Sequence, residues 1–265
     1  MHSTVPHPNG PKYLSVVVPA FNEAPTLARI IEKLVQIPDL LEVVVVDDHS
    51  TDQTPDVCSE IVEKYDVVRC VRHERNMGKT AALRTGFGLT KGEIVIVQDA
   101  DLEYDPAEIS EVIRPIVEGF ADVVYGSRFM VKRAARVLYF YHYLANKALT
   151  FLSNVLTNLN ITDVETCYKA FKGDIIRNMN ITSSGFGFEI EVTAKMAKLK
   201  CVLYEVPISY YGRTYEEGKK ITYMDGFAAL FYIFRFNLFC SLRRSFKTRP
   251  QLSRPAQPLL DSDPV

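Results

Sequence analysis

The sequence predicts an α/β fold in which a mostly parallel sheet has helices on both faces. Short apolar runs rich in β-branched residues alternate with helix-length segments through the first half of the chain. Continuous apolar runs of this kind are typical of parallel strands that are buried on both faces. The chain has 265 residues, of which 47% are hydrophobic and 24% are charged. These ordinary values for a globular protein argue against a disordered chain or a fibre.

The alternation assigns the elements in order. Strands are predicted at the apolar runs, which are Leu14–Val18, Val43–Val46, Val67–Val71, Ile94–Val97 and Asp122–Tyr125. Helices are predicted between them, at Ala24–Gln36, Thr54–Tyr65, Lys79–Leu89 and Pro106–Glu118, the last with proline at a favourable first position. After Tyr125 the alternation stops. The sequence then predicts an amphipathic stretch at about 134–157, a helix near 188–199, a strand near 202–208 and an aromatic helix at Phe227–Leu242.

Charge and cysteine content exclude several classes of protein. Lys and Arg number 31 and Asp and Glu number 32, so no nucleic acid is expected as a partner. The five cysteines are an odd number without a C-x-x-C pair, which excludes a complete disulfide framework and a tetrathiolate zinc site. The N-terminal segment MHSTVPHPNGPK has no apolar region, so no signal peptide is expected. Together these features favour a reducing compartment and a cytoplasmic location.

Two stretches lack acidic residues although the chain as a whole is balanced. No Asp or Glu occurs within residues 123–162 or 226–260, where basic residues are mixed with Phe, Tyr and Leu. This mixture is typical of a helix that lies on an anionic membrane surface; the alternative is a buried helix with a solvated basic end. The longest apolar stretch, Gly226–Leu242, is interrupted by Arg235 and is too short to span a bilayer, so no transmembrane helix is expected.

Acidic residues follow several of the predicted strands, at the edge where such sheets bind ligands. The loops after the strands are Pro19–Glu23, Asp47–Asp52, Gln98–Glu103 and Gly126–Arg128. Asp99 and Asp101 flank Ala100, and Glu103 lies two residues further on. Carboxylate ligands suit Mg²⁺ or Mn²⁺, ions that bridge a protein to a substrate diphosphate, so a metal site is predicted here. The alternative is an acidic turn that caps the helix beginning at Pro106.

The segment Asn76–Thr80 contains the Gly-Lys-Thr of a phosphate-binding P-loop, but the rest of that motif is absent. A P-loop requires glycine five positions before Gly78, and this position is occupied by His73. An ATPase is therefore excluded. Lys79 either contacts a bound donor substrate or is a solvent-exposed residue at the start of a helix. His73 is predicted to be a polar loop residue.

Taken together, these motifs resemble the family 2 glycosyltransferases with a GT-A fold, and within them the polyprenyl-phosphate sugar transferases such as the dolichyl-phosphate mannose and glucose synthases. The resemblance runs from about Leu14 to about Ile221. It is carried by the segments Val18–Glu23, Val46–Asp52, Asn76–Lys79, Asp99–Asp101, Gly126–Arg128 and Gly212–Lys220.

The resemblance implies roles for individual residues. The donor nucleotide is implied to contact residues of the first two loops, which are Pro19, Phe21, Glu23, Val46 and Asp48. The donor and the metal are implied to contact Asp99, Ala100, Asp101 and Glu103, where many members have Gln in place of Glu103. Phosphate groups are implied to pair with Arg128, Arg213 and Lys219, and Lys79 is a further candidate for substrate binding. The residues expected in catalysis are Asp99, Asp101 and Arg128, with Asp99 the best candidate if a general base is used.

The implied reaction is an inverting, metal-dependent transfer of a hexose to a polyprenyl phosphate at the cytoplasmic face of a membrane. The donor is implied to be of the UDP-glucose type or GDP-mannose, with Mg²⁺ or Mn²⁺ as cofactor. Two departures weaken the case for GDP-mannose: His142 stands where some mannose synthases carry Arg, and Asp163–Lys169 replaces their Asp-Pro-x-Ser-Gly. The alternatives are a family 2 enzyme with a soluble acceptor, a nucleotidyltransferase and an inactive membrane-associated scaffold.

The expected organisation is one GT-A, Rossmann-like domain at 13–221 with amphipathic interfacial helices. Its nucleotide-binding half is 13–122 and its acceptor-binding half is 123–221. Glu189 and Glu191 in the second half either favour a helix dipole or line the sugar pocket. An amphipathic membrane-surface helix is expected at 222–249, and its aromatic residues could also pair two copies of the chain. Flexible tails are expected at 1–12 and 250–265.

Overall fold

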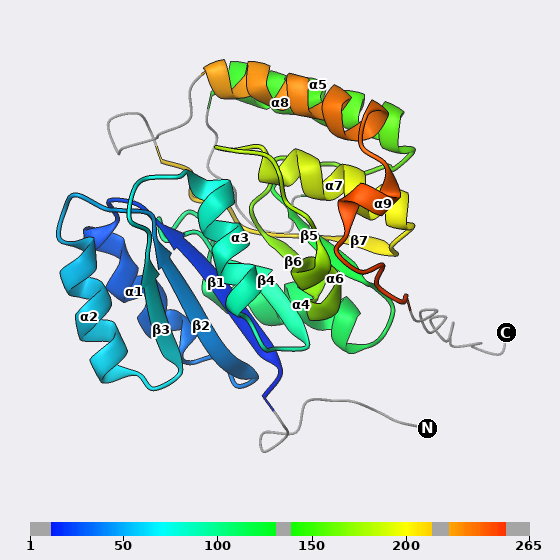
Figure 1. Cartoon of the computed structure of the whole chain (residues 1–265). Helices are drawn as coiled ribbons and strands as arrows, with labels where there is room; N and C mark the ends of the chain where they lie inside the picture. Colours follow the sequence, from blue (N-terminus) through cyan, green and yellow to red (C-terminus); the bar gives the residue numbers. More distant parts are fainter. Residues whose placement is uncertain (1–11, 131–138, 214–222, 253–265) are drawn as a thin grey trace, which may run out of the picture.

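The computed structural model describes residues 12–130, 139–213 and 223–252, and it confirms the predicted α/β class. Within these residues, seven strands form one sheet in the order β3-β2-β1-β4-β6-β5-β7 (Figure 1). The strands are β1 Leu14–Ala20, β2 Leu40–Asp47, β3 Val68–Arg72, β4 Ile94–Val97, β5 Val123–Ser127, β6 Lys169–Lys172 and β7 Leu203–Pro207. The predicted tails at 1–12 and 250–265 lie almost wholly outside the described residues, as does the start of the predicted 134–157 stretch.

The sheet is parallel except around β6. Strand β1 pairs in parallel with β2 and β4, β2 with β3, and β5 with β7. Strand β6 lies between β4 and β5 and is antiparallel to both. The sequence did not predict β6, because its Lys-Ala-Phe-Lys segment carries a charged residue at each end and shows no apolar run. The predicted strands are otherwise confirmed, with boundaries that differ by a few residues.

Helices lie between successive strands and after the last strand. They are α1 Ala24–Leu34, α2 Thr54–Lys64, α3 Lys79–Leu89, α4 Ile109–Val117, α5 Phe140–Thr157, α6 Gly173–Asn178, α7 Phe188–Leu199, α8 Tyr223–Leu238 and α9 Leu242–Ser245. A short 3₁₀ turn, Pro106–Glu108, precedes α4, and Asp105 caps it by accepting a hydrogen bond from the Ala107 amide (3.3 Å). The predicted single aromatic helix is divided, because α8 ends at Leu238 and α9 begins after Ser241.

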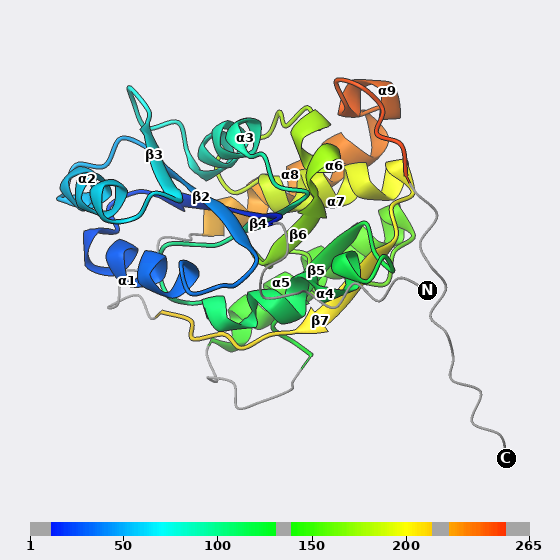
Figure 2. The same ribbon diagram turned by 90° about the horizontal axis from the view of Figure 1, so that it is seen from below.

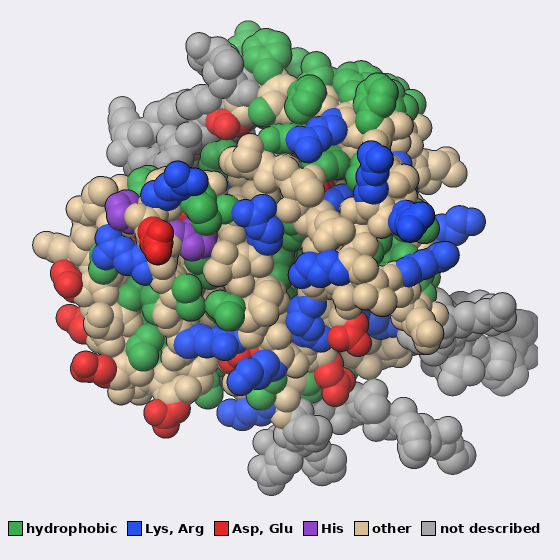
Figure 3. All heavy atoms as spheres, in the orientation of Figure 1, with side chains coloured by type: hydrophobic (Ala, Val, Ile, Leu, Met, Phe, Trp, Pro, Cys, Tyr) green, Lys and Arg blue, Asp and Glu red, His purple; other side chains and the backbone are tan. Residues whose placement is uncertain are grey.

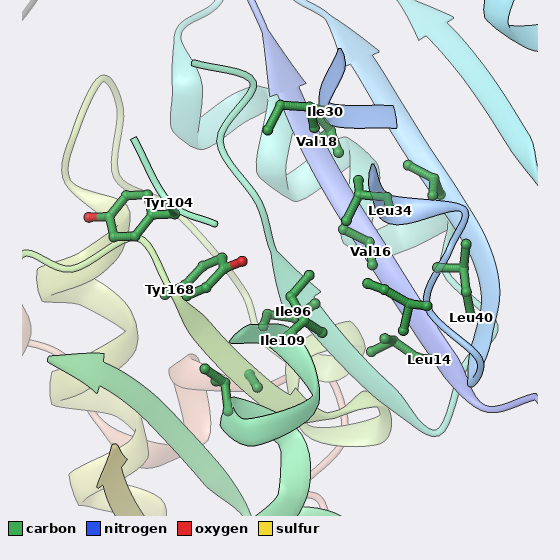
Figure 4. Close-up of a cluster of buried hydrophobic side chains, with 14 of the residues drawn as sticks. Leu14, Val16, Val18, Ile30, Leu34, Leu40, Ile96, Tyr104, Ile109 and Tyr168 are labelled. Carbon is green, nitrogen blue, oxygen red and sulfur yellow. The ribbon is translucent and has the colours of Figure 1, made fainter. Parts of the chain in front are cut away.

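Alternate residues of β1 face opposite layers of helices. Val16 and Val18 pack on the face covered by α1 and α4, where Ile30 and Leu34 lie against them (Figure 4). Val17 points to the other face and belongs to the core formed with α3 and α7. Figure 2 shows the same layers, with α1 and α4 on one side of the sheet and α3, α6 and α7 on the other. Because its side chains alternate between two apolar cores, β1 is fixed between the helix layers. The loop that follows β1 therefore starts from a fixed position.

Helices α5 and α8 run side by side across one end of the molecule (Figure 1). Their outer faces carry exposed apolar side chains, which Figure 3 shows gathered at this end; those more than half exposed are Phe140, Tyr141, Leu144, Phe151, Val155, Phe227, Phe231 and Leu238. Among the helices that the structure describes, none has the length and apolar character needed to cross a membrane.

Two glycines of α3 provide a test of this packing. A Cβ at Gly86 would lie 2.3 Å from Val17 Cγ1, whereas a Cβ at Gly88 would meet nothing within 4 Å. We expect Gly86→Ala to lower the free energy of unfolding by about 1–3 kcal/mol through overpacking. Gly88→Ala, the matched control, should raise it by up to about 1 kcal/mol through helix propensity. Urea unfolding measures both, and equal effects at the two positions would contradict this account of the α3–β1 contact.

Candidate active site

The parallel strands deliver the predicted acidic loops to one edge of the sheet. Glu23 follows β1, Asp48 follows β2, and Asp99 and Asp101 follow β4. Because β1 lies between β2 and β4, these loops are neighbours. Arg128 follows β5 at the same edge. The prediction that these residues share the carboxyl edge of the sheet is therefore confirmed.

Arg213 joins three of the predicted segments. Its guanidinium donates to the Glu23 carboxylate (Nη2–Oε2, 3.1 Å) and to the backbone carbonyl of Asp101 (Nη2–O, 2.6 Å). Its backbone N–H donates to the Glu103 carboxylate (2.6 Å). The side chains of Arg213 and Glu23 are 20% and 10% exposed, so this ion pair is screened less than one on the open surface. Arg213 thus holds the loops after β1 and β4 against the segment after β7.

A hollow of about 430 Å³ lies beside this junction, and its lining includes Glu23, Asp101, Tyr211 and Arg213. Burial, together with the negative charges of Asp99 and Glu103, raises the pKa of Asp101 to about 7. One Asp101 oxygen accepts a hydrogen bond from the Glu103 amide (3.0 Å). The hollow therefore has an acidic wall whose charges repel one another, which is the electrostatic condition that favours a bound cation.

Glu103 and Asp99 are both engaged by neighbouring groups. Glu103 accepts hydrogen bonds from the Tyr210 hydroxyl (2.8 Å) and from the Arg213 amide. Asp99 pairs with Lys79 (2.9 Å). In the part of the chain that the structure describes, no group of three or more His, Cys, Asp or Glu is placed to hold one ion. The predicted set of Asp99, Asp101 and Glu103 is thus not gathered at a single point, and its role as one metal site stays a prediction.

The donor chemistry nevertheless fits a divalent cation that is shared with a substrate. Mg²⁺ in nucleotide-dependent enzymes is held by one or two carboxylates, and phosphate oxygens and water complete its coordination. Asp101, at the wall of the hollow, and the adjacent Asp99 satisfy this smaller requirement. Glu103 fits better as the group that holds the 210–213 segment in place.

Lys79 lies at the centre of a partly buried polar cluster. Its Nζ lies 2.9 Å from Asp99 Oδ1, 2.7 Å from Cys167 Sγ and 3.7 Å from Glu189 Oε1. Burial alone would lower the pKa of Lys79, but the charges of Asp99 and Glu189 hold that pKa above its usual value. The lysine therefore stays charged and links the loop after β4 to the start of α7. The Lys79 side chain is only 15% exposed, so it is mostly withdrawn from solvent, and its contact with a donor stays a prediction.

Asp48 organises the neighbouring loop. Its carboxylate is hydrogen-bonded to the His73 ring (2.7 Å), and it accepts from the backbone amides of Met77 (2.9 Å) and Gly78 (2.6 Å). Gly78 has a φ of 86°, a left-handed conformation that favours glycine, and it directly precedes α3. These contacts position Lys79 and place His73 as a polar loop residue, as predicted.

The remaining predicted residues differ in accessibility. Pro19 and Phe21 are partly exposed at the edge of the sheet, whereas the side chains of Val46 and Ala100 are buried. Lys219 lies outside the described residues. The roles of these positions in binding the donor stay predictions.

Arg128 is fixed by an acidic residue that the sequence analysis did not assign to the site. Its Nε and Nη2 donate to the two oxygens of Asp163, both at 2.7 Å. Burial alone would raise the pKa of Asp163, but the Arg128 guanidinium holds that pKa below its usual value. Asn146 of α5 donates to the same carboxylate (3.3 Å). Arg128 is thus oriented by Asp163 and connected to α5, and its predicted contact with a phosphate stays a prediction.

Lys169 closes the segment that carries Asp163 and Cys167. It is fully buried, and its Nζ donates to the carbonyls of Val164 (2.9 Å) and Thr166 (2.5 Å). The ammonium also lies 4.1 Å from the centre of the Tyr125 ring. Burial lowers the pKa of Lys169 to about 8. The buried ammonium of Lys169 therefore fixes the backbone of residues 164–166.

Sequence reasoning missed three residues of this site, which are Asp163, Cys167 and Tyr210; it named Glu189 as a candidate but not its contact with Lys79. One signal was available for Asp163, because it is the first acidic residue after a 40-residue stretch without any. Cys167 and Tyr210 gave no such signal, because their contacts depend on β6 and on the segment after β7.

Comparison with known proteins bears on this geometry. The family described as Glycosyl transferase family 2 matches residues 15–179. An uncharacterised protein of Methanocaldococcus jannaschii is 32% identical over 232 residues, which cover 84% of this chain and 92% of that protein. A dolichol-phosphate mannosyltransferase of Pyrococcus furiosus is 29% identical over 210 residues, or 78% of this chain. The alignment spans only 58% of the length of the Pyrococcus enzyme.

Solved structures support the fold. Glucosyl-3-phosphoglycerate synthase from Mycobacterium tuberculosis, crystallised with Mn²⁺, uridine diphosphate and phosphoglyceric acid, matches with a TM-score of 0.62. The two chains are 19% identical, and the match covers 86% of this chain and 79% of the other. This similarity is one of architecture, in agreement with the sheet and helix layers described above.

The buried Lys169 predicts a specific pH dependence of stability. Its pKa of about 8 lies below the value of about 10.4 for an unfolded lysine, so the unfolded chain binds more protons at this group between those pH values. The contribution of Lys169 to stability therefore increases as pH rises from 8 to 10, by on the order of 3 kcal/mol.

Urea unfolding of the wild type and Lys169→Met across pH 7–10 measures this effect as the difference between the two curves. Lys91→Met, at an exposed position, controls for the loss of one lysine. Parallel curves for the wild type and Lys169→Met would show that Lys169 is not held in a shifted state.

Proposed function

The chain belongs to glycosyl transferase family 2, and from this premise we propose that it transfers a hexose from a nucleotide sugar to a polyprenyl phosphate. The donor is a UDP-glucose type or GDP-mannose, and the transfer inverts the anomeric configuration. The reaction takes place at the cytoplasmic face of a membrane. The name of the Pyrococcus relative supports the acceptor class. The single observation that carries the proposal is the exposed apolar face of α5 and α8, which is linked to the site through Asn146 and Asp163.

The acidic edge supports the donor half of the reaction. Asp101 and Glu23 line the hollow, and Arg213, which pairs with Glu23 and the Asp101 carbonyl, adds a guanidinium to the same wall, a group that suits a diphosphate. A divalent cation, when bound by Asp101 and Asp99, would neutralise charge on the departing nucleoside diphosphate. Lys79 stays charged beside Asp99, so its ammonium is a second positive group next to the proposed cation site.

The acceptor half needs little proton chemistry. A polyprenyl phosphate is already an anion, so a dedicated general base is optional; Asp99 is the candidate if one is used. Arg128 is held by Asp163 in a fixed orientation, and it stacks over the Tyr210 ring with its guanidinium carbon 5.2 Å from the ring centre. We assign Arg128 and Lys219 to the acceptor or donor phosphates, with the Arg128–Asp163 pair setting the direction of the guanidinium.

The apolar face explains how such an acceptor is reached. An isoprenoid chain stays in the bilayer while its phosphate lies at the level of the headgroups. Phe231 and Leu238 are 61% and 59% exposed, and Phe234 lies between them at 41%. Arg235 and the basic residues of α9 flank this face and would attract an anionic surface. An enzyme with a soluble acceptor has no need of this face, so we favour the lipid acceptor.

Transfer of label tests the reaction. The purified protein is incubated with a membrane lipid extract, Mg²⁺ or Mn²⁺, and radiolabelled UDP-glucose or GDP-mannose. We expect label from one donor to enter the organic phase. Asp101→Asn should reduce the rate by at least about 100-fold, because a carboxylate that would hold the charge-neutralising cation is lost. Asp66→Asn, at an exposed position in the turn between α2 and β3, should leave the rate unchanged. Label that enters only aqueous products would indicate a soluble acceptor instead.

Membrane docking is tested by changing three exposed residues of α8. We expect the triple variant Phe231→Ser, Phe234→Ser, Leu238→Ser to bind vesicles at least about 100-fold more weakly, because each side chain contributes roughly 1 kcal/mol or more when it leaves water. The matched variant Phe231→Leu, Phe234→Leu, Leu238→Met should retain binding. Circular dichroism checks that both variants fold. Unchanged sedimentation of the serine variant with vesicles would refute docking through α8.

A further inference from the structure

A second hollow lies away from the acidic edge, between α3, α6 and α9. Its volume is about 280 Å³, and its lining includes four basic side chains, which are Arg84, Arg177, Arg244 and Lys247. None of the described residues that line it is Asp or Glu. Figure 3 shows Lys and Arg side chains gathered on this face of the molecule, below the apolar side chains of α5 and α8.

The hollow is built by segments far apart in the sequence. Met179 and Phe246 form an antiparallel bridge. The Asn180 amide donates to the Ser245 carbonyl (2.9 Å), and the Lys247 amide donates to the Asn178 carbonyl (2.7 Å). These backbone bonds fix the chain after α9 against the end of α6, so the basic residues are brought together by the fold.

The basic side chains keep most of their charge uncompensated. Arg177 pairs with Asp174, whose side chain is 88% exposed and lies outside the lining. Within the described residues, no carboxylate forms an ion pair with Arg84, Arg244 or Lys247. Arg84 and Lys247 instead donate to the backbone carbonyls of Ile181 (3.3 Å) and Arg177 (3.2 Å). The hollow therefore presents a net positive rim.

The floor of the hollow is apolar. Phe87, Ile176 and Met179 line it and are each at most 3% exposed in the folded chain. A positive rim over an apolar floor matches a phosphate group attached to an apolar body, because the cations pair with the phosphate oxygens while the body covers the floor.

We propose that this hollow binds the phosphate of an anionic lipid headgroup, at a site separate from the acidic edge. The lipid source rests on the docking face proposed above: α9 follows α8 directly, and Phe239, between them, is 77% exposed. The phosphate chemistry rests on the hollow itself. A headgroup held here would fix the rotation of the protein on the membrane, because the contact lies to one side of the apolar face.

The test uses the full chain and soluble probes, so it does not depend on sugar transfer. Dihexanoyl phosphatidate below its micelle concentration and inorganic pyrophosphate are titrated separately into protein with ¹³C-labelled methionine methyl groups. We expect the lipid to shift the Met179 methyl signal while the exposed Met77 is unaffected. Pyrophosphate acting alone in this way would overturn the lipid assignment, and no shift with either probe would overturn the site.

Matched variants separate the hollow from general charge. We expect Arg84→Gln with Lys247→Gln to weaken binding to vesicles of phosphatidylcholine with one-fifth phosphatidate by about tenfold or more. Arg29→Gln with Lys64→Gln removes the same charge from exposed positions on α1 and α2 and should have a much smaller effect. Equal losses in the two double variants would show that only overall charge matters and would refute the site. If the wild-type protein binds lipid through the hollow but transfers no sugar, the proposed reaction fails while the lipid site stands.

Discussion

The arrangement of the acidic edge depends on the guanidinium of Arg213. Burial raises the pKa of Asp101, and the negative charges of Asp99 and Glu103 in the same loop after β4 raise it further through repulsion. Arg213 offsets the repulsion because its planar group reaches Glu23 and the Asp101 carbonyl together, while its own amide holds Glu103. The segment after β7 therefore completes a site whose carboxylates come from loops in the first half of the chain.

Much of the fold could be predicted because its parallel strands are buried on both faces. Runs such as Ile94–Val97 can be identified as strands from their apolar composition. Their carboxyl ends then locate the ligand-binding edge of the sheet. Strand β6 escaped prediction because Lys169 and Lys172 interrupt its pattern, although Lys169 is fully buried. The buried ammonium is satisfied by carbonyls of the loop that directly precedes β6, and a lysine buried in this way cannot be recognised from an apolar pattern.

The same limit applies to the site. Acidic residues next to strand ends were found, since their position follows from the strands. Partners such as Asp163 for Arg128, or Cys167 for Lys79, come from loops whose path depends on the inserted strand and on α5. Sequence alone predicts which groups carry charge at the edge, but it does not predict which of those charges are already paired. That distinction separates Glu103, engaged with Tyr210, from Asp101, which lines the hollow.

The position of β6 makes the two halves of the chain inseparable. It comes from the second half, yet it lies between β4 and β5 and hydrogen-bonds to both. A fragment that ended near residue 122 would leave β4, whose four residues are all apolar and buried in this structure, as an exposed edge strand. Exposed edge strands pair with other chains and promote aggregation. The first half of the chain therefore cannot be transferred by itself, and grafting it onto another protein would require a replacement for this one short strand.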